Sequence, residues 1–209
     1  MMRILLTILF FLFACSQEGA EHVGGVAEED CCEPLKGGVD PAALSDESLF
    51  LLDHAFEDQH AESRRLVDLA GKPVVLAMIF THCEYACPAI LQDLHKLEEA
   101  MSEAERDATQ WVLVSFDVER DVPEVLAAYA EREELDPARW TLLHGDEGAV
   151  RELAALLGVR YKPMPAGGFS HSNRISLLNA KGELAAHIDG LNVNVAPLVE
   201  ARRRMDVQG

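Results

Sequence analysis

Residues 73–91 read PVVLAMIFTHCEYACPAIL, a long apolar run followed by two cysteines and a helical pattern. The run at 73–80 is continuous, as expected for a strand that is buried on both faces of a sheet. Four apolar residues after the cysteines recur at spacings of four, three and four: Ile90, Leu94, Leu97 and Met101. This spacing predicts one apolar stripe along a helix. The sequence therefore predicts a buried strand whose C-terminal end carries Cys83 and Cys87 to the N-terminus of a helix.

Strand and helix patterns alternate through the rest of the chain. The predicted elements are strands at 48–52, 64–69 and 111–116, a helix at 123–132, a strand at 140–144, a helix at 147–157, strands at 174–178 and 183–188, and a helix at 195–205. The first two strands suggest a leading hairpin, and residues 179–182 (NAKG) give the turn signal of a later one. Parallel crossovers followed by an antiparallel hairpin predict an α/β, thioredoxin-like fold. We expect a central mixed sheet flanked by helices, with an N-terminal β-hairpin.

Composition bounds the number of domains and the kinds of partner. The 209 residues suit one domain with a sizeable core. The formal net charge is -18, and the longest basic block is residues 202–204 (RRR). Nucleic acid is not expected as a partner, because a phosphate backbone requires a basic footprint. The acidic balance favours cations or a basic partner surface.

The N-terminus has the pattern of a secretory signal. Residues 1–15 read MMRILLTILFFLFAC, in which one positive charge precedes an apolar run. The run is too short to span a bilayer, since that takes roughly 20 residues. Its end, followed by Ser16, looks like a bacterial lipobox in which Cys15 becomes the lipidated N-terminus. Phe13 is bulky for that motif, so ordinary cleavage nearby is an alternative, and a buried apolar segment is another.

We therefore expect an exported protein on the periplasmic side of a bacterial cell envelope, anchored to a membrane through a lipid on Cys15. Residues 16–45 contain glycine pairs and acidic residues with little periodicity, which predicts a flexible tether. A thioredoxin-like domain is predicted at 46–206. Cys31 and Cys32 fall in the tether, where they could pass a metal onward, pair between molecules, or remain solvated without a role.

Three residues separate Cys83 from Cys87, and this spacing bears on their chemistry. A helix N-terminus favours a thiolate, which is both a nucleophile and a ligand for soft metals. A disulfide needs Cβ atoms about 3.5–4.5 Å apart, whereas positions four apart on a helix lie roughly 5–6 Å apart. The pair could therefore hold Cu(I), zinc or an iron–sulfur centre. It could also form a disulfide if the loop bends, or consist of two inert thiols.

Several motifs together resemble the Sco/SenC family of copper-binding, thioredoxin-like proteins. They are GKP at 71–73, THCEYACP at 81–88, SFDVERDVP at 115–123, WTLLHG at 140–145 and HSNRISLLNAKGE at 171–183. The resemblance covers about residues 46–192. It implies that Cys83, Cys87 and His171 bind copper, as Cu(I) or Cu(II), where the alternative for His171 is an ordinary surface-loop histidine. It also makes Asp117 a candidate for docking a partner or tuning copper, although a capping or solvated carboxylate is equally consistent with the sequence.

The function that the resemblance implies is that of a metallochaperone. Such a protein delivers copper to a respiratory oxidase, usually to the dinuclear copper centre of cytochrome c oxidase. Its partner would be a copper-accepting oxidase subunit or another copper carrier. The family is also assigned a thiol–disulfide reductase role, in which Cys83 and Cys87 would be the redox pair that reduces the acceptor's cysteines.

The chain departs from the family at three points. Ser170 stands where Asp commonly precedes the histidine, so a carboxylate that could orient the imidazole is absent. Glu84 follows the first cysteine in place of Pro, and a tether stands where the family has a transmembrane helix. The first two departures bear on copper affinity and redox poise.

Three neighbouring side chains leave further alternatives open. His82 adjoins Cys83 and is an alternative ligand, unless its side chain points away. Met164 precedes His171 by a few residues and is interpreted as a packing or solvent-facing side chain. A peroxiredoxin-like peroxidase would need a threonine and an arginine beside an activated cysteine. Thr81 precedes Cys83 by two residues, but no feature of the sequence places an arginine there.

Overall fold

β3 (Val74–Ile79) is the strand that the quoted apolar run predicts, and all six of its residues are buried. The computed structural model describes residues 40, 43–165 and 167–208, which belong to the compact unit Pro34–Gly209. The other unit, Met1–Glu33, lies outside the described residues, as do Cys15, Cys31 and Cys32. The predictions about the signal and the tether therefore stay predictions. None of the described helices is long and apolar enough to cross a membrane.

The described residues form a mixed α/β fold. Its other strands are β1 (Ala55–Asp58), β2 (Ser63–Arg65), β4 (Gln110–Ser115), β5 (Trp140–Gly145), β6 (Tyr161–Pro163), β7 (Phe169–His171), β8 (Arg174–Leu178) and β9 (Leu184–Asp189). Its α-helices are α1 (Ala86–Glu99), α2 (Glu103–Asp107), α3 (Pro123–Arg132), α4 (Glu147–Leu156) and α5 (Ala196–Gln208). Seven strands form the main sheet in the order β2-β1-β5-β4-β3-β8-β9, and β6 pairs with β7 in a separate small sheet.

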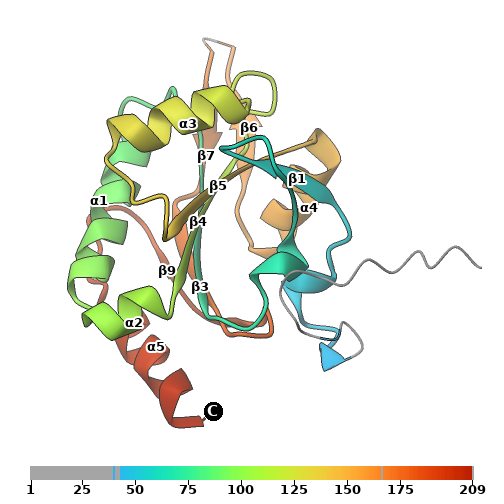
Figure 1. Cartoon of the computed structure of the whole chain (residues 1–209). Helices are drawn as coiled ribbons and strands as arrows, with labels where there is room; N and C mark the ends of the chain where they lie inside the picture. Colours follow the sequence, from blue (N-terminus) through green and yellow to red (C-terminus); the bar gives the residue numbers. More distant parts are fainter. Residues whose placement is uncertain (1–39, 41–42, 166, 209) are drawn as a thin grey trace, which may run out of the picture. The chain divides into compact units, whose positions relative to one another are not determined.

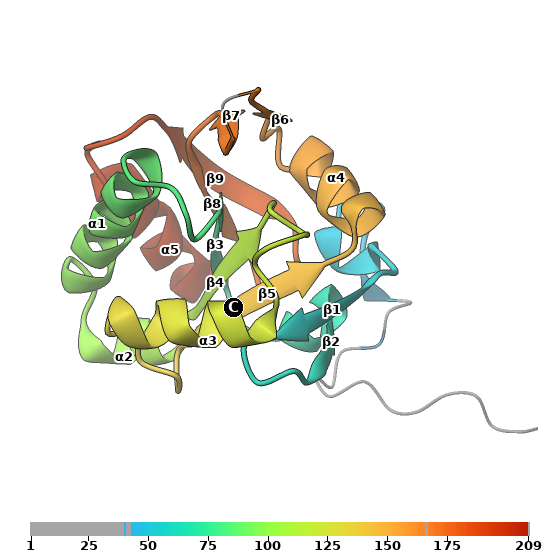
Figure 2. The same cartoon turned by 90° about the horizontal axis from the view of Figure 1, so that it is seen from above.

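Strand direction in the main sheet follows from the connections along the chain. β3, β4 and β5 are mutually parallel neighbours joined through helices, whereas β8 pairs antiparallel with β3 and β9 antiparallel with β8. Because both parallel crossovers step in the same direction across the sheet, their helices α1 and α3 cover the same face. α5 also lies on that face and α4 on the other (Figures 1 and 2). The carboxyl ends of β3 and β4 therefore meet at one edge of the sheet, where the cysteines follow.

The leading hairpin exists, but the strands predicted at 48–52 and 64–69 were wrong. Residues Leu49–Leu51 form a 3₁₀ helix, because the Ser48 hydroxyl accepts the N–H of Phe50 and the segment packs on the turn between β8 and β9. The Leu49 N–H donates to the Gly182 carbonyl at 3.0 Å. The hairpin itself is formed by β1 and β2, and the second predicted strand overlaps β2 only at its start before a 3₁₀ helix at Leu66–Leu69. The apolar pattern of residues 48–52 had predicted a strand, but tertiary packing makes this segment a 3₁₀ helix.

Two further features were not predicted from the sequence. The short helix α2 begins at a capping box, in which Ser102 accepts the N–H of Glu105 and Glu105 accepts the N–H of Ser102. The β6–β7 pair extends residues 161–171 into a second sheet that ends at His171. The predicted parallel core, α4 and the final hairpin and helix are otherwise present within a few residues of their expected bounds.

Candidate metal centre

The loop that follows β3 presents the two cysteines at the start of α1. The Cys83 N–H donates to the Phe80 carbonyl at 3.3 Å, which turns the chain immediately after the strand. α1 begins at Ala86, so Cys87 is its second residue. The Cys87 N–H, one of the free donors of the helix N-terminus, points at the Cys83 sulfur with N and Sγ 3.3 Å apart. This contact holds the Cys83 side chain at the start of α1.

The two thiols differ in their exposure to solvent. Cys83 is half-buried, whereas Cys87 is 1% exposed, and neither forms a disulfide. Burial is the largest cause that raises the pKa of the Cys87 thiol, because it disfavours the charged form. Cys87 therefore stays protonated in the absence of a metal, and Cys83 is the more accessible of the two sulfurs.

His171 ends β7 and lies with its ring against two phenylalanines. The ring centroids are 5.0 Å from Phe116 and 6.0 Å from Phe80. Its Nδ1 is 3.2 Å from the Ser172 carbonyl oxygen, so the neutral imidazole can donate there and keep the lone pair of Nε2 free. Burial lowers the pKa of His171, which favours this neutral form.

The three predicted copper ligands come together in space. The Sγ atoms of Cys83 and Cys87 and a ring nitrogen of His171 all lie within 4.8 Å of one another. One segment, the β3–α1 loop, supplies both sulfurs, and the small β6–β7 sheet supplies the imidazole. Two thiolates and an imidazole are a soft donor set that fits Cu(I) in three-coordinate geometry. The residues present therefore fit the metal that the resemblance implies.

Other predicted residues gather in a second cluster next to the first. His82, Asp117 and Asp121 have ligand atoms within 4.8 Å of one another, and His82 is not part of the cysteine cluster. Asp117 is buried, and its Oδ2 accepts from Arg120 Nε at 2.6 Å. This carboxylate therefore forms an ion pair within the protein, and its predicted role in docking a partner stays a prediction.

A cleft of about 680 Å³ is lined by two members of the first cluster and one of the second. Its lining includes Cys83, His171, His82, Arg120, Met164 and Tyr85. Arg120 was not predicted from the sequence. Its motif, SFDVERD, begins at the end of β4, and because β4 is parallel to β3, both strands end at the same edge of the sheet. In the structure Arg120 is paired with Asp117, and the Thr81 hydroxyl donates to Asp121.

Fold and site together define a thioredoxin-like α/β protein that carries a Cys-x3-Cys pair and a facing histidine. The chain belongs to the SCO1/SenC family, whose family model matches residues 43–205. A protein of Stutzerimonas stutzeri named "Putative copper-binding protein" is 28% identical over 135 residues, which are 63% of this chain. The matched region spans 65% of that relative's length.

Solved structures show the same fold. Bradyrhizobium japonicum ScoI with copper bound has a TM-score of 0.62 and 23% identity, covering 73% of this chain and 96% of that one. A SCO1/SenC family lipoprotein from Bacillus anthracis has a TM-score of 0.66 and 24% identity, over 73% of this chain and 92% of that one. BsSco, described as a member of the Sco family of cytochrome c oxidase assembly proteins, has a TM-score of 0.64 and 22% identity, over 74% and 92% of the two chains. The predicted family and fold are thus confirmed.

Proposed function

We propose that this protein is a copper carrier in which Cys83, Cys87 and His171 bind one copper ion. The observation that carries the proposal is the convergence of two sulfurs and one imidazole nitrogen within 4.8 Å. The copper-binding name of the Stutzerimonas relative and the copper-bound Bradyrhizobium structure support the choice of metal. Because copper is the cargo, the protein has to bind it tightly and still release it to an acceptor by ligand exchange.

The surroundings of Cys83, Cys87 and His171 suit tight but exchangeable copper binding. The Cys87 N–H donates to the Cys83 sulfur and fixes its position, and the Ser172 carbonyl orients the His171 ring. The cleft lets an acceptor's thiolate or imidazole approach the three-coordinate ion as a fourth ligand. Copper then moves by ligand exchange, without covalent turnover of the protein.

The acceptor that we propose is the dinuclear copper centre of a cytochrome c oxidase, reached directly or through another copper carrier. Support comes from BsSco, which belongs to a family of cytochrome c oxidase assembly proteins. We further propose that the protein works on the periplasmic side of a bacterial envelope, anchored through Cys15. The Bacillus anthracis relative is a lipoprotein, which agrees with that anchor.

A titration of the reduced protein with Cu(I) and with Cu(II) tests the copper site. We expect one equivalent to bind, and binding to be lost in both Cys83→Ser and Cys87→Ser. His171→Ala should weaken binding by more than the roughly 100-fold upper end seen when only an outer residue of a metal site is changed. The proposal is overturned if no copper binds, or if His171→Ala binds as the unsubstituted protein does.

A second candidate function is thiol–disulfide reduction of the acceptor by the same two cysteines. It is favoured by the free thiols, whose sulfurs lie within 4.8 Å of each other, and by the description of BsSco as having a disulfide switch. Oxidation of Cys83 and Cys87 to a disulfide would supply the two electrons and two protons that convert an acceptor disulfide into two thiols. His171→Ala separates the two functions, because copper affinity should collapse while the rate of dithiol exchange is retained.

A further inference from the structure

His82 is an exposed histidine that lies outside the cysteine cluster. It lines the same cleft as Cys83 and His171, and its side chain is 56% exposed. The three predicted ligands are, by contrast, buried or half-buried. A second, exposed imidazole therefore lines the cleft that also reaches Cys83 and His171.

A chain of hydrogen bonds fixes the orientation of the His82 ring. Its Nδ1 is 3.0 Å from Thr81 Oγ1, and the Thr81 hydroxyl donates to Asp121 Oδ1 at 2.5 Å. Since the hydroxyl proton is used toward Asp121, its oxygen is left to accept a proton from Nδ1. The neutral ring then carries its lone pair on Nε2. A histidine that ligates a metal is commonly held in this way, through its other nitrogen and a carboxylate.

The carboxylate at the end of this chain is built into the fold. Asp121 is 0% exposed, and its Oδ2 accepts the Thr81 N–H at 2.8 Å and the Ser115 hydroxyl at 2.6 Å. The neighbouring Asp117 is paired with Arg120. Both carboxylates are thus already bound by protein donors. Asp121 holds Thr81 and, through the Thr81 hydroxyl, His82, whereas Asp117 is held by Arg120.

We propose that His82 is an exchange ligand for the copper ion, an inference that rests on the proposed function. While copper enters or leaves, a bond forms between His82 Nε2 and the ion as one cysteine sulfur releases it. Copper keeps its oxidation state, and the released sulfur keeps its electron pair or takes a proton from water. His82 acts on the path and not in the resting site. Its loss should therefore slow loading and release by the same factor and leave the equilibrium affinity unchanged.

Stopped-flow exchange of Cu(I) between the reduced protein and the chelator bicinchoninate tests this inference. In His82→Gln we expect both rate constants to fall about 10-fold, which corresponds to about 1.4 kcal/mol in the barrier, with the dissociation constant nearly unchanged. Thr81→Val removes the relay hydroxyl at similar volume and should reproduce part of the slowing. His187→Gln is the matched control, since His187 is also exposed and lies beside a carboxylate, 3.8 Å from Asp189, but on β9. That variant should exchange copper at the original rates.

The possible outcomes separate this inference from the proposed function. Unchanged rates in His82→Gln, with one equivalent of copper still bound, overturn the exchange role alone. A larger dissociation constant with an unchanged loading rate would show that His82 is a ligand in the resting site, which also overturns the exchange role. If His187→Gln slows copper exchange equally, the effect comes from non-specific binding by surface imidazoles, and the exchange role of His82 is overturned. Failure of the unsubstituted protein to bind copper would instead remove the proposed function itself.

Discussion

Aromatic packing sets where the His171 imidazole lies. Phe116 is 2% exposed, and its ring stacks on Tyr161 at 5.1 Å and meets Phe169 edge-on at 5.2 Å. The same ring contacts His171 at 5.0 Å. Phe116 therefore connects the end of β4 to both strands of the small sheet that carries the histidine. A metal site with only one imidazole depends on such contacts to keep that ring within reach of the sulfurs.

Phe116→Leu should weaken copper binding while the protein stays folded. Leucine retains an apolar side chain at a cost of about 1 kcal/mol, but it no longer holds the His171 ring. We expect roughly a 10-fold loss in Cu(I) affinity, the lower end of what outer residues of metal sites contribute. Competition with a Cu(I) chelator measures it. Phe56→Leu, a core change in β1, is the control, and an equal loss of affinity there would contradict the positioning role.

Among the elements, the sequence predicts long segments well and short ones poorly. All six residues of β3 are buried, so its apolar run identified it without ambiguity. β6 and β7 have three residues each, too few to show a period of two, and Pro163 with the Gly167–Gly168 pair gives the pattern of a loop. For this reason the position of His171 could be expected only from the family resemblance. The cysteines, in contrast, follow directly from a strand pattern and a helix pattern.

The turn between β8 and β9 requires glycine at residue 182. Gly182 has φ of +80°, and a Cβ there would lie 2.6 Å from Phe50 Cγ and 2.8 Å from Ser48 Oγ. Gly182→Ala should therefore lose more than the roughly 1–2 kcal/mol that the left-handed conformation alone costs. Gly167→Ala is the matched control, because its φ is +87° with open space around the Cβ. Urea midpoints compare them, and equal losses would show that the contact with the 3₁₀ helix is unimportant.

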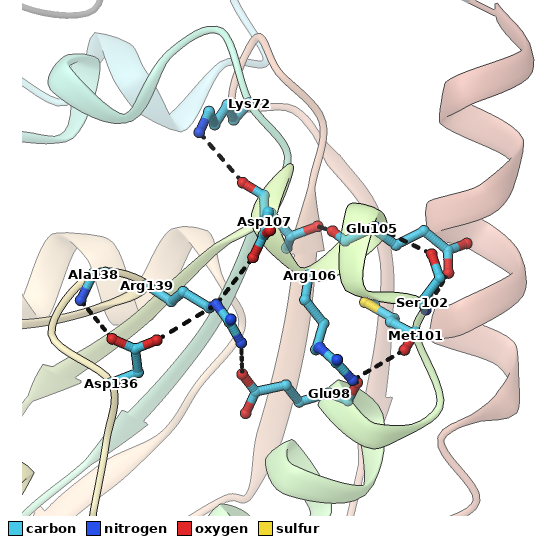
Figure 3. Close-up of polar contacts among 11 residues, drawn as sticks. Lys72, Glu98, Met101, Ser102, Glu105, Arg106, Asp107, Asp136, Ala138 and Arg139 are labelled. Carbon is cyan, nitrogen blue, oxygen red and sulfur yellow. Dashed lines mark hydrogen bonds and ion pairs between the residues drawn. The ribbon is translucent and has the colours of Figure 1, made fainter.

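Helix α2 is linked to α5 by an ion pair that should respond to acid. Glu105 Oε1 accepts from Arg203 Nε at 2.8 Å and Oε2 from the Ser102 N–H at 2.6 Å, and Figure 3 shows the contact with Ser102. The hydrogen bond from Arg203 is the largest cause that lowers the pKa of Glu105 from 4.5 to about 2. A carboxyl whose folded-state pKa is depressed contributes stability above its unfolded pKa and loses it as the pH falls through the folded value.

Glu105→Gln should thus be less stable than the unsubstituted protein at pH 7, and most of this difference should be gone at about pH 2, the folded-state pKa of Glu105. Glutamine can still accept the Ser102 N–H of the capping box, so the difference isolates the charge. Urea unfolding at pH 7, 4 and 2 provides the measurement, and the gap should close between pH 4.5 and 2. A gap that is independent of pH would assign the effect to packing of the side chain.

For the molecule as a whole, the two ends of the parallel strands carry different features, ion pairs at the amino ends and the predicted metal ligands at the carboxyl ends. At the amino ends, Arg139 Nη1 lies 3.5 Å from Glu98 Oε1 of α1, and its Nε lies 3.1 Å from Asp107 Oδ1 and 3.6 Å from Asp136 Oδ2 (Figure 3). One guanidinium thereby joins segments from α1, α2 and the loop before β5. At the carboxyl ends, the cysteine loop and the small sheet meet across the cleft. The Arg139 ion pairs and the three predicted ligands thus lie at opposite ends of the parallel strands.

Copper should therefore stabilise the whole fold, because a single ion links the β3–α1 loop to the β6–β7 sheet. A ligand that binds only the folded state at 100 times its dissociation constant adds about 2.7 kcal/mol. At the 2–4 °C per kcal/mol typical of chains of about 150–250 residues, this predicts a rise of about 5–10 °C in melting temperature. Circular dichroism of the reduced protein with and without Cu(I) measures the rise, which should nearly vanish in His171→Ala and vanish in Cys83→Ser. If His171→Ala shows the full rise, the two sulfurs alone hold the ion, and the small sheet has no part in binding it.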